Sequence, residues 1–129
     1  MATAVQFHDA AAIAAHYRDL AILEREVFVV AGLDAHGRLL CQRRTQGQVG
    51  GVAVAPRDVL RLLLLAGAVA FVLVHNHPSG VLAPSAADVA FTLHLAAAAR
   101  LCGLHLLDHV ILAGPGWLSL RQEGILEVR

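Results

Sequence analysis

The sequence is poor in charge and contains no lysine. Charged residues make up only 16% of the 129 residues, and ten basic residues, all of them arginine, balance ten acidic ones. A formal net charge of zero argues against nucleic-acid binding through bulk positive charge. A local patch is a separate matter, because Arg43 and Arg44 form a dense basic pair. Contact with nucleic acid therefore stays open.

Cysteines and long apolar runs are also scarce. Cys41 and Cys102 lie far apart and belong to no CxxC pair, which is more typical of buried thiols than of a disulfide or a metal knuckle. The first fifteen residues contain no Lys or Arg, so they lack the charged start of a secretory signal. The longest apolar run, residues 62–74, is shorter than the roughly 20 residues of a membrane-spanning helix. These absences predict a cytoplasmic protein that does not enter a membrane.

Hydrophobic residues, at 57%, are abundant enough to form a packed core, and we expect one domain over residues 1–129. Apolar periodicity and turn residues predict helices over residues 9–23, 56–65 and 85–102, and strands over residues 27–33, 38–45, 68–74, 104–113 and 117–121. Residues 46–53 fit a loop or a short strand, and residues 75–84 a loop. The order of these elements predicts the α/β class, with a single mixed β-sheet and flanking helices.

The chemistry is concentrated where the predicted central strand ends. His75 and His77 are two residues apart, so both side chains point to one face of the sheet. Asp88 lies one turn into the next predicted helix, and the loop between them can bring its carboxylate back towards the imidazoles. Two histidines and a carboxylate with an open fourth position are typical of a catalytic zinc site.

Two simpler interpretations apply to the same residues. Pairs of the HxH kind are common and most of them bind no metal. The segment from Ser85 to Asp88 also fits a helix capping box, [ST]xx[DE], which needs no metal. Ser85 can cap its helix and still turn its hydroxyl towards the site, so the two roles stay open together.

The stretch HNHPSGVLAPSAAD resembles the JAMM metal motif, HxH, seven residues, SxxD. Its wording is similar to the RadC-like branch of the JAB/MPN superfamily, and the likeness runs from about Glu24 to Gly124. The resemblance implies a JAB/MPN (cytidine deaminase-like) sandwich with a Zn²⁺ ion on His75, His77 and Asp88. It also implies that Ser85 stabilises an oxyanion and that an upstream glutamate is the general base.

Glu24 and Glu26 both lie where that base is expected, and Glu26 is preferred because the family pattern places the acid directly before the apolar strand that starts at Val27. The resemblance also covers Asp108-His109, which fits either a pair that orients a metal ligand or a purely structural feature.

The leading hypothesis is a zinc metallopeptidase of the JAMM type that cleaves an amide bond in a peptide or a ubiquitin-like conjugate, with activity that depends on a partner or a homo-oligomer. The alternative is a RadC-like accessory or DNA-repair-associated binding module with a vestigial or regulatory metal site. A metal-dependent hydrolase for another substrate, such as a nucleotide, is a third. Deamination is the least favoured, because the H-x-E and P-C-x-x-C signature is absent.

Overall fold

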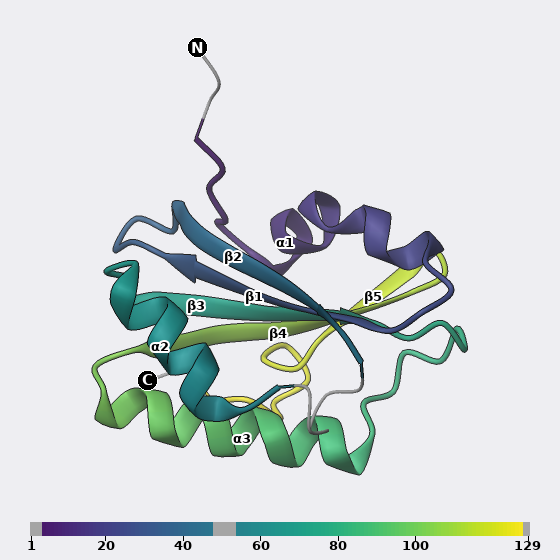
Figure 1. Ribbon diagram of the computed structural model, residues 1–129. Helices are drawn as coiled ribbons and strands as arrows, with labels where there is room; N and C mark the ends of the chain where they lie inside the picture. Colours follow the sequence, from purple (N-terminus) through teal and green to yellow (C-terminus); the bar gives the residue numbers. More distant parts are fainter. Residues whose placement is uncertain (1–3, 48–53, 128–129) are drawn as a thin grey trace.

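The computed structural model describes residues 4–47 and 54–127. Within them, five strands form one mixed sheet in the order β2-β1-β3-β4-β5 (Figure 1). The strands are β1 (Val27–Leu33), β2 (Leu39–Gln46), β3 (Ala70–Asn76), β4 (His105–Ala113) and β5 (Gly116–Ser119). Only β3 and β4 run parallel, and the other neighbouring pairs are antiparallel. The predicted α/β class and single mixed sheet are confirmed.

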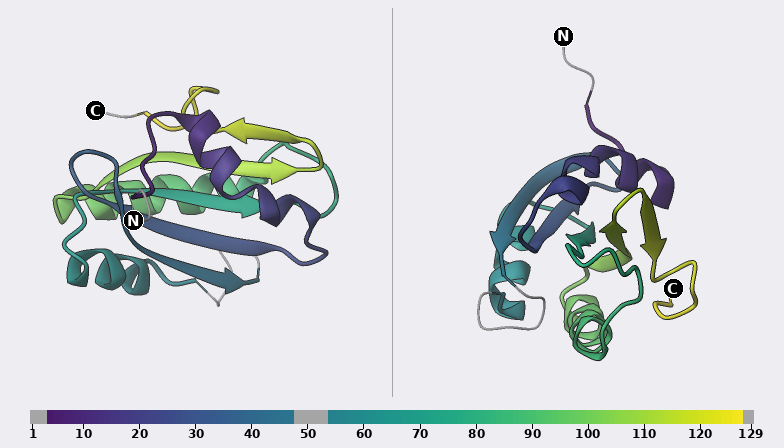
Figure 2. Two further views of the ribbon diagram at one scale, coloured as in Figure 1. Left: turned by 90° about the horizontal axis from the view of Figure 1, so that it is seen from above. Right: turned by 90° about the vertical axis from the view of Figure 1, so that its right-hand side faces the viewer.

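Helices cover both faces of the sheet. Helix α1 (Ala10–His16) and the 3₁₀ turn η1 (Arg18–Ile22) lie over one face, while α2 (Pro56–Leu65) and α3 (Ala86–Leu101) lie over the other (Figures 1 and 2). Each face has its own apolar core: Phe28 and Leu73 pack towards α2 and α3, and Val29 and Val72 pack towards α1. Strand β3 is central and all seven of its residues are buried, as expected for a strand covered on both faces.

Helix α3 connects the two parallel strands, and its ends have clear local causes. Ser85 is the N-cap, and Gly103, just past the last turn, has φ +76°, a conformation that glycine adopts without a Cβ penalty. The crossover from β3 through α3 to β4 brings the start of α3 beside the carboxyl end of β3. That juxtaposition places Asp88 close to the histidines.

Some predicted boundaries were wrong. The first helix ends at His16, and the chain continues as the 3₁₀ turn η1. Tyr17 and Leu20, three residues apart, are both fully buried, which suits a 3₁₀ helix because it has three residues per turn. Strand β3 begins and ends two residues later than predicted, so His75 lies in the strand rather than in a loop. The last strand, β5, is shorter than expected. Residues 48–53, in the segment predicted as a loop or a strand, lie outside the described residues.

Candidate metal centre

The three side chains predicted as metal ligands converge at the carboxyl end of β3. The Nε2 atoms of His75 and His77 are 2.9 Å apart, and Asp88 Oδ2 lies 3.2 Å from the Nε2 of His77 and 3.5 Å from that of His75. Ligand atoms at the usual zinc distances in a tetrahedral site lie about 3.3–3.4 Å from each other. The three atoms therefore have the spacing needed to bind one metal ion.

The two histidines are held from different directions. His75 is fully buried in β3, between Phe28 of β1 and Ile111 of β4. His77 lies just past the strand, and its Nδ1 is 2.7 Å from the backbone carbonyl oxygen of Val81. A carbonyl only accepts hydrogen bonds, so Nδ1 of His77 carries the ring proton and donates it to that carbonyl. A neutral His77 therefore presents an unprotonated Nε2 to the site, the form that binds metals.

Asp88 belongs to the capping box and to the candidate site at the same time. Its backbone N–H donates to Ser85 Oγ at 3.0 Å, and its Oδ2 accepts a hydrogen bond from the Ser85 N–H at 2.8 Å. That same Oδ2 faces His77. Burial raises the pKa of Asp88, but the contact with a protonated form of His75 and the hydrogen bonds that Ser85 donates outweigh burial and leave the pKa below its usual value. Asp88 is thus held as a carboxylate, and the two interpretations of the SxxD segment are compatible.

The Ser85 side chain is exposed at the N-terminus of α3. Its oxygen accepts the hydrogen bond from the Asp88 N–H at 3.0 Å, and the Ser85 side chain also hydrogen-bonds to the Asp88 carboxylate. Because the side chain is exposed, the hydroxyl can turn from that carboxylate to donate to a group that approaches the site.

The upstream acid nearest the histidines is Glu26. Its Oε1 lies 3.7 Å from Nε2 of His75, and Glu26, His75, His77 and Asp88 each have a ligand atom within 4.8 Å of those of the others. This group could hold a metal ion. Glu24 is exposed and does not belong to the group. The structure thus places Glu26, rather than Glu24, beside the three predicted ligands.

Asn76, between the two histidines, holds the segment that carries Glu26. Its Nδ2 donates to the carbonyl oxygen of Arg25 at 2.9 Å, and its Oδ1 accepts from the N–H of Val27 at 2.7 Å. These two hydrogen bonds fix the backbone on both sides of Glu26. Asn76 was not among the predicted site residues, although a polar side chain at the end of a fully buried strand is almost always hydrogen-bonded.

His109 and Thr92 form a second contact with the site. His109 Nε2 lies 2.7 Å from His75 Nδ1, and His109 Nδ1 lies 2.6 Å from the Thr92 hydroxyl. Burial, and then the proximity of His75, lower the pKa of His109 well below its usual value. Asp108 contacts the backbone N–H of His109 rather than its ring, and its other oxygen accepts a bond from Ser119. The partner of the His109 ring is therefore Thr92, not Asp108.

The remaining histidines lie elsewhere. They are all exposed, and none belongs to a candidate metal group within the part of the chain that the structure describes: His8, His16, His36, His94 and His105.

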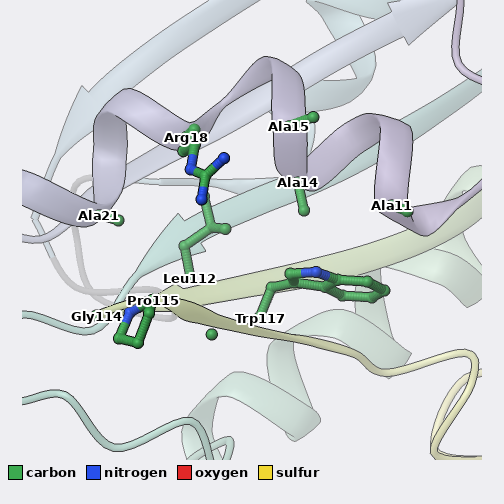
Figure 3. Close-up of a pocket in the computed structure, with 10 residues that line it drawn as sticks. Ala11, Ala14, Ala15, Arg18, Ala21, Leu112, Gly114, Pro115 and Trp117 are labelled. Carbon is green, nitrogen blue, oxygen red and sulfur yellow. The ribbon is translucent and has the colours of Figure 1, made fainter.

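A hollow of about 160 Å³ lies on the opposite face of the sheet, between α1, η1 and the turn from β4 to β5. Small residues line most of it, and Arg18 and Trp117 border it (Figure 3). Leu112, which also lines it, belongs to the α1-side core, whereas its neighbour Ile111 belongs to the other core. The sheet therefore separates this hollow from the candidate metal centre.

Among the described helices, none has both the length and the apolar character needed to cross a bilayer.

Comparison with known proteins agrees with the geometry. The family model described as a RadC-like JAB domain matches residues 6–125. A UPF0758 protein of Acidithiobacillus ferrooxidans is 45% identical over 101 residues, which cover 78% of this chain and 45% of the relative. A UPF0758 protein of Alcanivorax borkumensis is 41% identical over 100 residues, which cover 77% of this chain and 45% of the relative. A UPF0758 protein of Trichormus variabilis is 41% identical over 113 residues, which cover 87% of this chain and 46% of the relative.

The chain spans about half the length of the curated relatives it matches. The match with the family model nevertheless covers every described strand and helix and every residue of the candidate centre. The five-stranded mixed sheet with its three helices is consistent with the JAB/MPN fold. The chain belongs to the family of RadC-like JAB domains.

Proposed function

We propose that this chain is a zinc-dependent hydrolase that cleaves an amide bond, as a peptidase or isopeptidase of the JAMM type. One observation carries the proposal. Three ligand atoms lie 2.9–3.5 Å apart, and a carboxylate oxygen of Glu26 lies 3.7 Å from one of them. Three protein ligands with a nearby acid are typical of a catalytic zinc site, whereas a structural site has a fourth protein ligand.

Each residue then has a definite role. His75, His77 and Asp88 hold the ion, and a bound Zn²⁺ supplies Lewis acidity that lowers the pKa of water towards about 7. The Glu26 carboxylate accepts a proton from the attacking water and returns it to the leaving amine. The exposed Ser85 hydroxyl turns from Asp88 to donate to the substrate oxygen on which negative charge develops.

Two observations support the proposed substrate class. The JAMM resemblance favours a peptide or a ubiquitin-like conjugate, and a net charge of zero gives little support for a nucleic-acid substrate. A partner or a second copy of the chain is proposed to align the substrate. A binding module whose metal site has no hydrolytic role is the outcome to distinguish from this proposal.

The metal is tested first, with purified protein stripped by a chelator and titrated with Zn²⁺. Wild type should bind one equivalent, and His77→Ala should bind at least a hundredfold more weakly because a ligand is lost. His94→Ala is the matched control, since His94 is exposed on α3 and belongs to no metal group in the described chain. Equal zinc binding by wild type and His77→Ala would contradict the proposal.

Hydrolysis is tested next, against peptides and ubiquitin-like conjugates. Glu26→Gln should retain zinc and lose about 10²–10⁴-fold in rate, the range for a general acid or base. Glu24→Gln is the control, because Glu24 is exposed outside the group. A protein that binds zinc tightly but cleaves no amide substrate would favour the binding module.

A further inference from the structure

Three fully buried side chains form a line that ends at the candidate metal centre. Thr92 lies on α3, His109 on β4 and His75 on β3, and each has no exposed surface. The Thr92 hydroxyl is 2.7 Å from the backbone carbonyl oxygen of Asp88 and 2.6 Å from His109 Nδ1. His109 Nε2 is in turn 2.7 Å from His75 Nδ1. Each contact is short enough to require one proton between its two atoms.

The Asp88 carbonyl, at the Thr92 end of this line, determines the position of every proton along it. The Asp88 carbonyl only accepts, so the single hydroxyl proton of Thr92 goes to that carbonyl. The Thr92 oxygen then accepts from His109, whose Nδ1 therefore carries a proton. The reverse arrangement would leave two oxygen atoms 2.7 Å apart with no proton between them.

The proton on His109 Nδ1 in turn determines where His75 carries its own proton. The His109 ring touches no carboxylate among the described residues, and a charge on so deeply buried a ring would have no partner. With its proton on Nδ1, His109 offers an unprotonated Nε2, so the 2.7 Å contact requires His75 to donate from Nδ1. The Nε2 of His75, on the other side of the ring, is left with its lone pair.

We propose that Thr92 and His109 are positioning residues that hold His75 in the Nδ1–H tautomer and so present its Nε2 to a metal ion. The inference rests on the proposed function only in assuming that the centre binds metal. The Val81 carbonyl does the same for His77. Two backbone carbonyls, of Asp88 and Val81, thus determine the tautomers of both histidines. Their Nε2 atoms face each other at 2.9 Å with no proton between them, which suits a cation.

The line differs from the usual support of a metal-bound histidine, in which a carboxylate, a backbone carbonyl or water accepts the second ring proton. Here a neutral histidine accepts it, and that histidine is correctly oriented only while Thr92 accepts from its far side. The tautomer of a metal ligand on β3 therefore depends on one hydroxyl group on α3. The loss of that hydroxyl has a specific consequence: His109 can move its proton to Nε2, and His75 must then carry its own proton on the metal-binding nitrogen.

The test uses Thr92→Val, which keeps the shape of the side chain and removes only the hydroxyl. We expect zinc affinity to fall about 10–100-fold, the usual cost of losing a group that supports a metal ligand. Thr92→Ser restores the hydroxyl and should bind zinc as wild type does. Thr45→Val makes the same change on β2, two strands from His75, and should leave zinc affinity unchanged.

The second measurement is the ¹H–¹⁵N correlation spectrum of the histidine rings in metal-free protein, which distinguishes the two tautomers without any assay of activity. Wild type and Thr92→Ser should show His75 protonated on Nδ1, and Thr92→Val should show it protonated on Nε2. Wild-type His75 protonated on Nε2, or a Thr92→Val variant with wild-type zinc affinity, would overturn the inference. If Thr92→Val does not fold, the wild-type spectrum decides. Failure to hydrolyse a substrate would contradict the proposed function alone.

Discussion

Replacing Asn76 by Ala tests how the segment before β1 is held beside the metal centre. The Asn76 side chain is 1% exposed and makes one hydrogen bond to Arg25 and one to Val27, on either side of Glu26. It contacts none of the three predicted ligand atoms. The substitution should therefore weaken the fold and displace Glu26 while it leaves the three candidate ligands in place.

The size of the effect follows from what each partner loses. The N–H of buried Val27 is left without an acceptor, which costs about 1–3 kcal/mol. Arg25 is exposed, so its carbonyl can bond to water instead, and that loss costs roughly 0.5–1.5 kcal/mol. The free energy of unfolding should fall by about 2–4 kcal/mol in total. With a urea dependence of about 2 kcal/mol per M, the unfolding midpoint should fall by roughly 1–2 M.

The assay is urea unfolding of wild type, Asn76→Ala and the control Gln46→Ala, together with zinc titration of each. Gln46 carries an exposed amide on β2, and its loss should change the unfolding free energy by no more than about 0.5 kcal/mol. Asn76→Ala should bind zinc within about threefold of wild type and lose hydrolysis of any substrate that wild type cleaves, because misplacing a catalytic group by about 1 Å costs around 10²-fold. An unfolding midpoint equal to that of Gln46→Ala would refute the reasoning. So would a loss of zinc affinity as large as that of His77→Ala.

Two further predictions concern the packing around the sheet. Burial raises the pKa of Tyr17, the single tyrosine, to about 12, so the folded protein keeps a proton that the unfolded chain loses near pH 10. Stability should therefore fall as pH rises from about 10 to 12, by at most about 1.4 kcal/mol per pH unit, and Tyr17→Phe should remove this slope. An absorbance rise of the folded protein near pH 10 would contradict it. Gly32→Ala would place a Cβ 2.6 Å from Cys41 Sγ and 2.8 Å from Leu63 Cδ2, and urea unfolding should show a loss of about 1–3 kcal/mol. Cys41→Ala in the same molecule should recover part of this loss. A Gly32→Ala variant as stable as wild type would contradict the prediction and show that the core accommodates the Cβ.

Elements with strong local signals were predicted closely. Strand β1 coincides with the predicted residues 27–33, because the apolar run ends at an Asp-Ala-His-Gly turn. Helix α2 coincides with residues 56–65, because Pro56 suits a first helical turn and Gly67 follows the last one. The HxH and SxxD segments could also be recognised from the spacing of residues along the chain alone. The proximity of their side chains could be anticipated because a short loop joins them.

Boundaries that depend on distant partners could not be predicted as well. The first helix gives way to a 3₁₀ turn at Tyr17, whose hydroxyl bonds to Gln42 on β2, and no feature of residues 9–23 indicates that contact. Strand β3 extends through His75 and Asn76 because Phe28 and Ile111 pair with His75 on either side. Histidine and asparagine at that position look like a loop until the neighbouring strands are known.

Residues in contact around the candidate metal centre lie far apart in sequence, so no local motif indicates these contacts. His109 is 34 residues from His75 in sequence, and Asn76 is 49 residues from Val27. His109 can reach His75 only because β3 and β4 pair in parallel with a register shift near Val72, which aligns Leu73 with His109 and His75 with Ile111. Moving β4 by one residue would turn Asp108 towards the site and His109 away from it, because successive side chains of a strand point to opposite faces. The candidate ligands are therefore encoded in one short stretch of the chain, whereas the proton positions proposed to prepare those side chains for a metal ion depend on the register of the whole sheet.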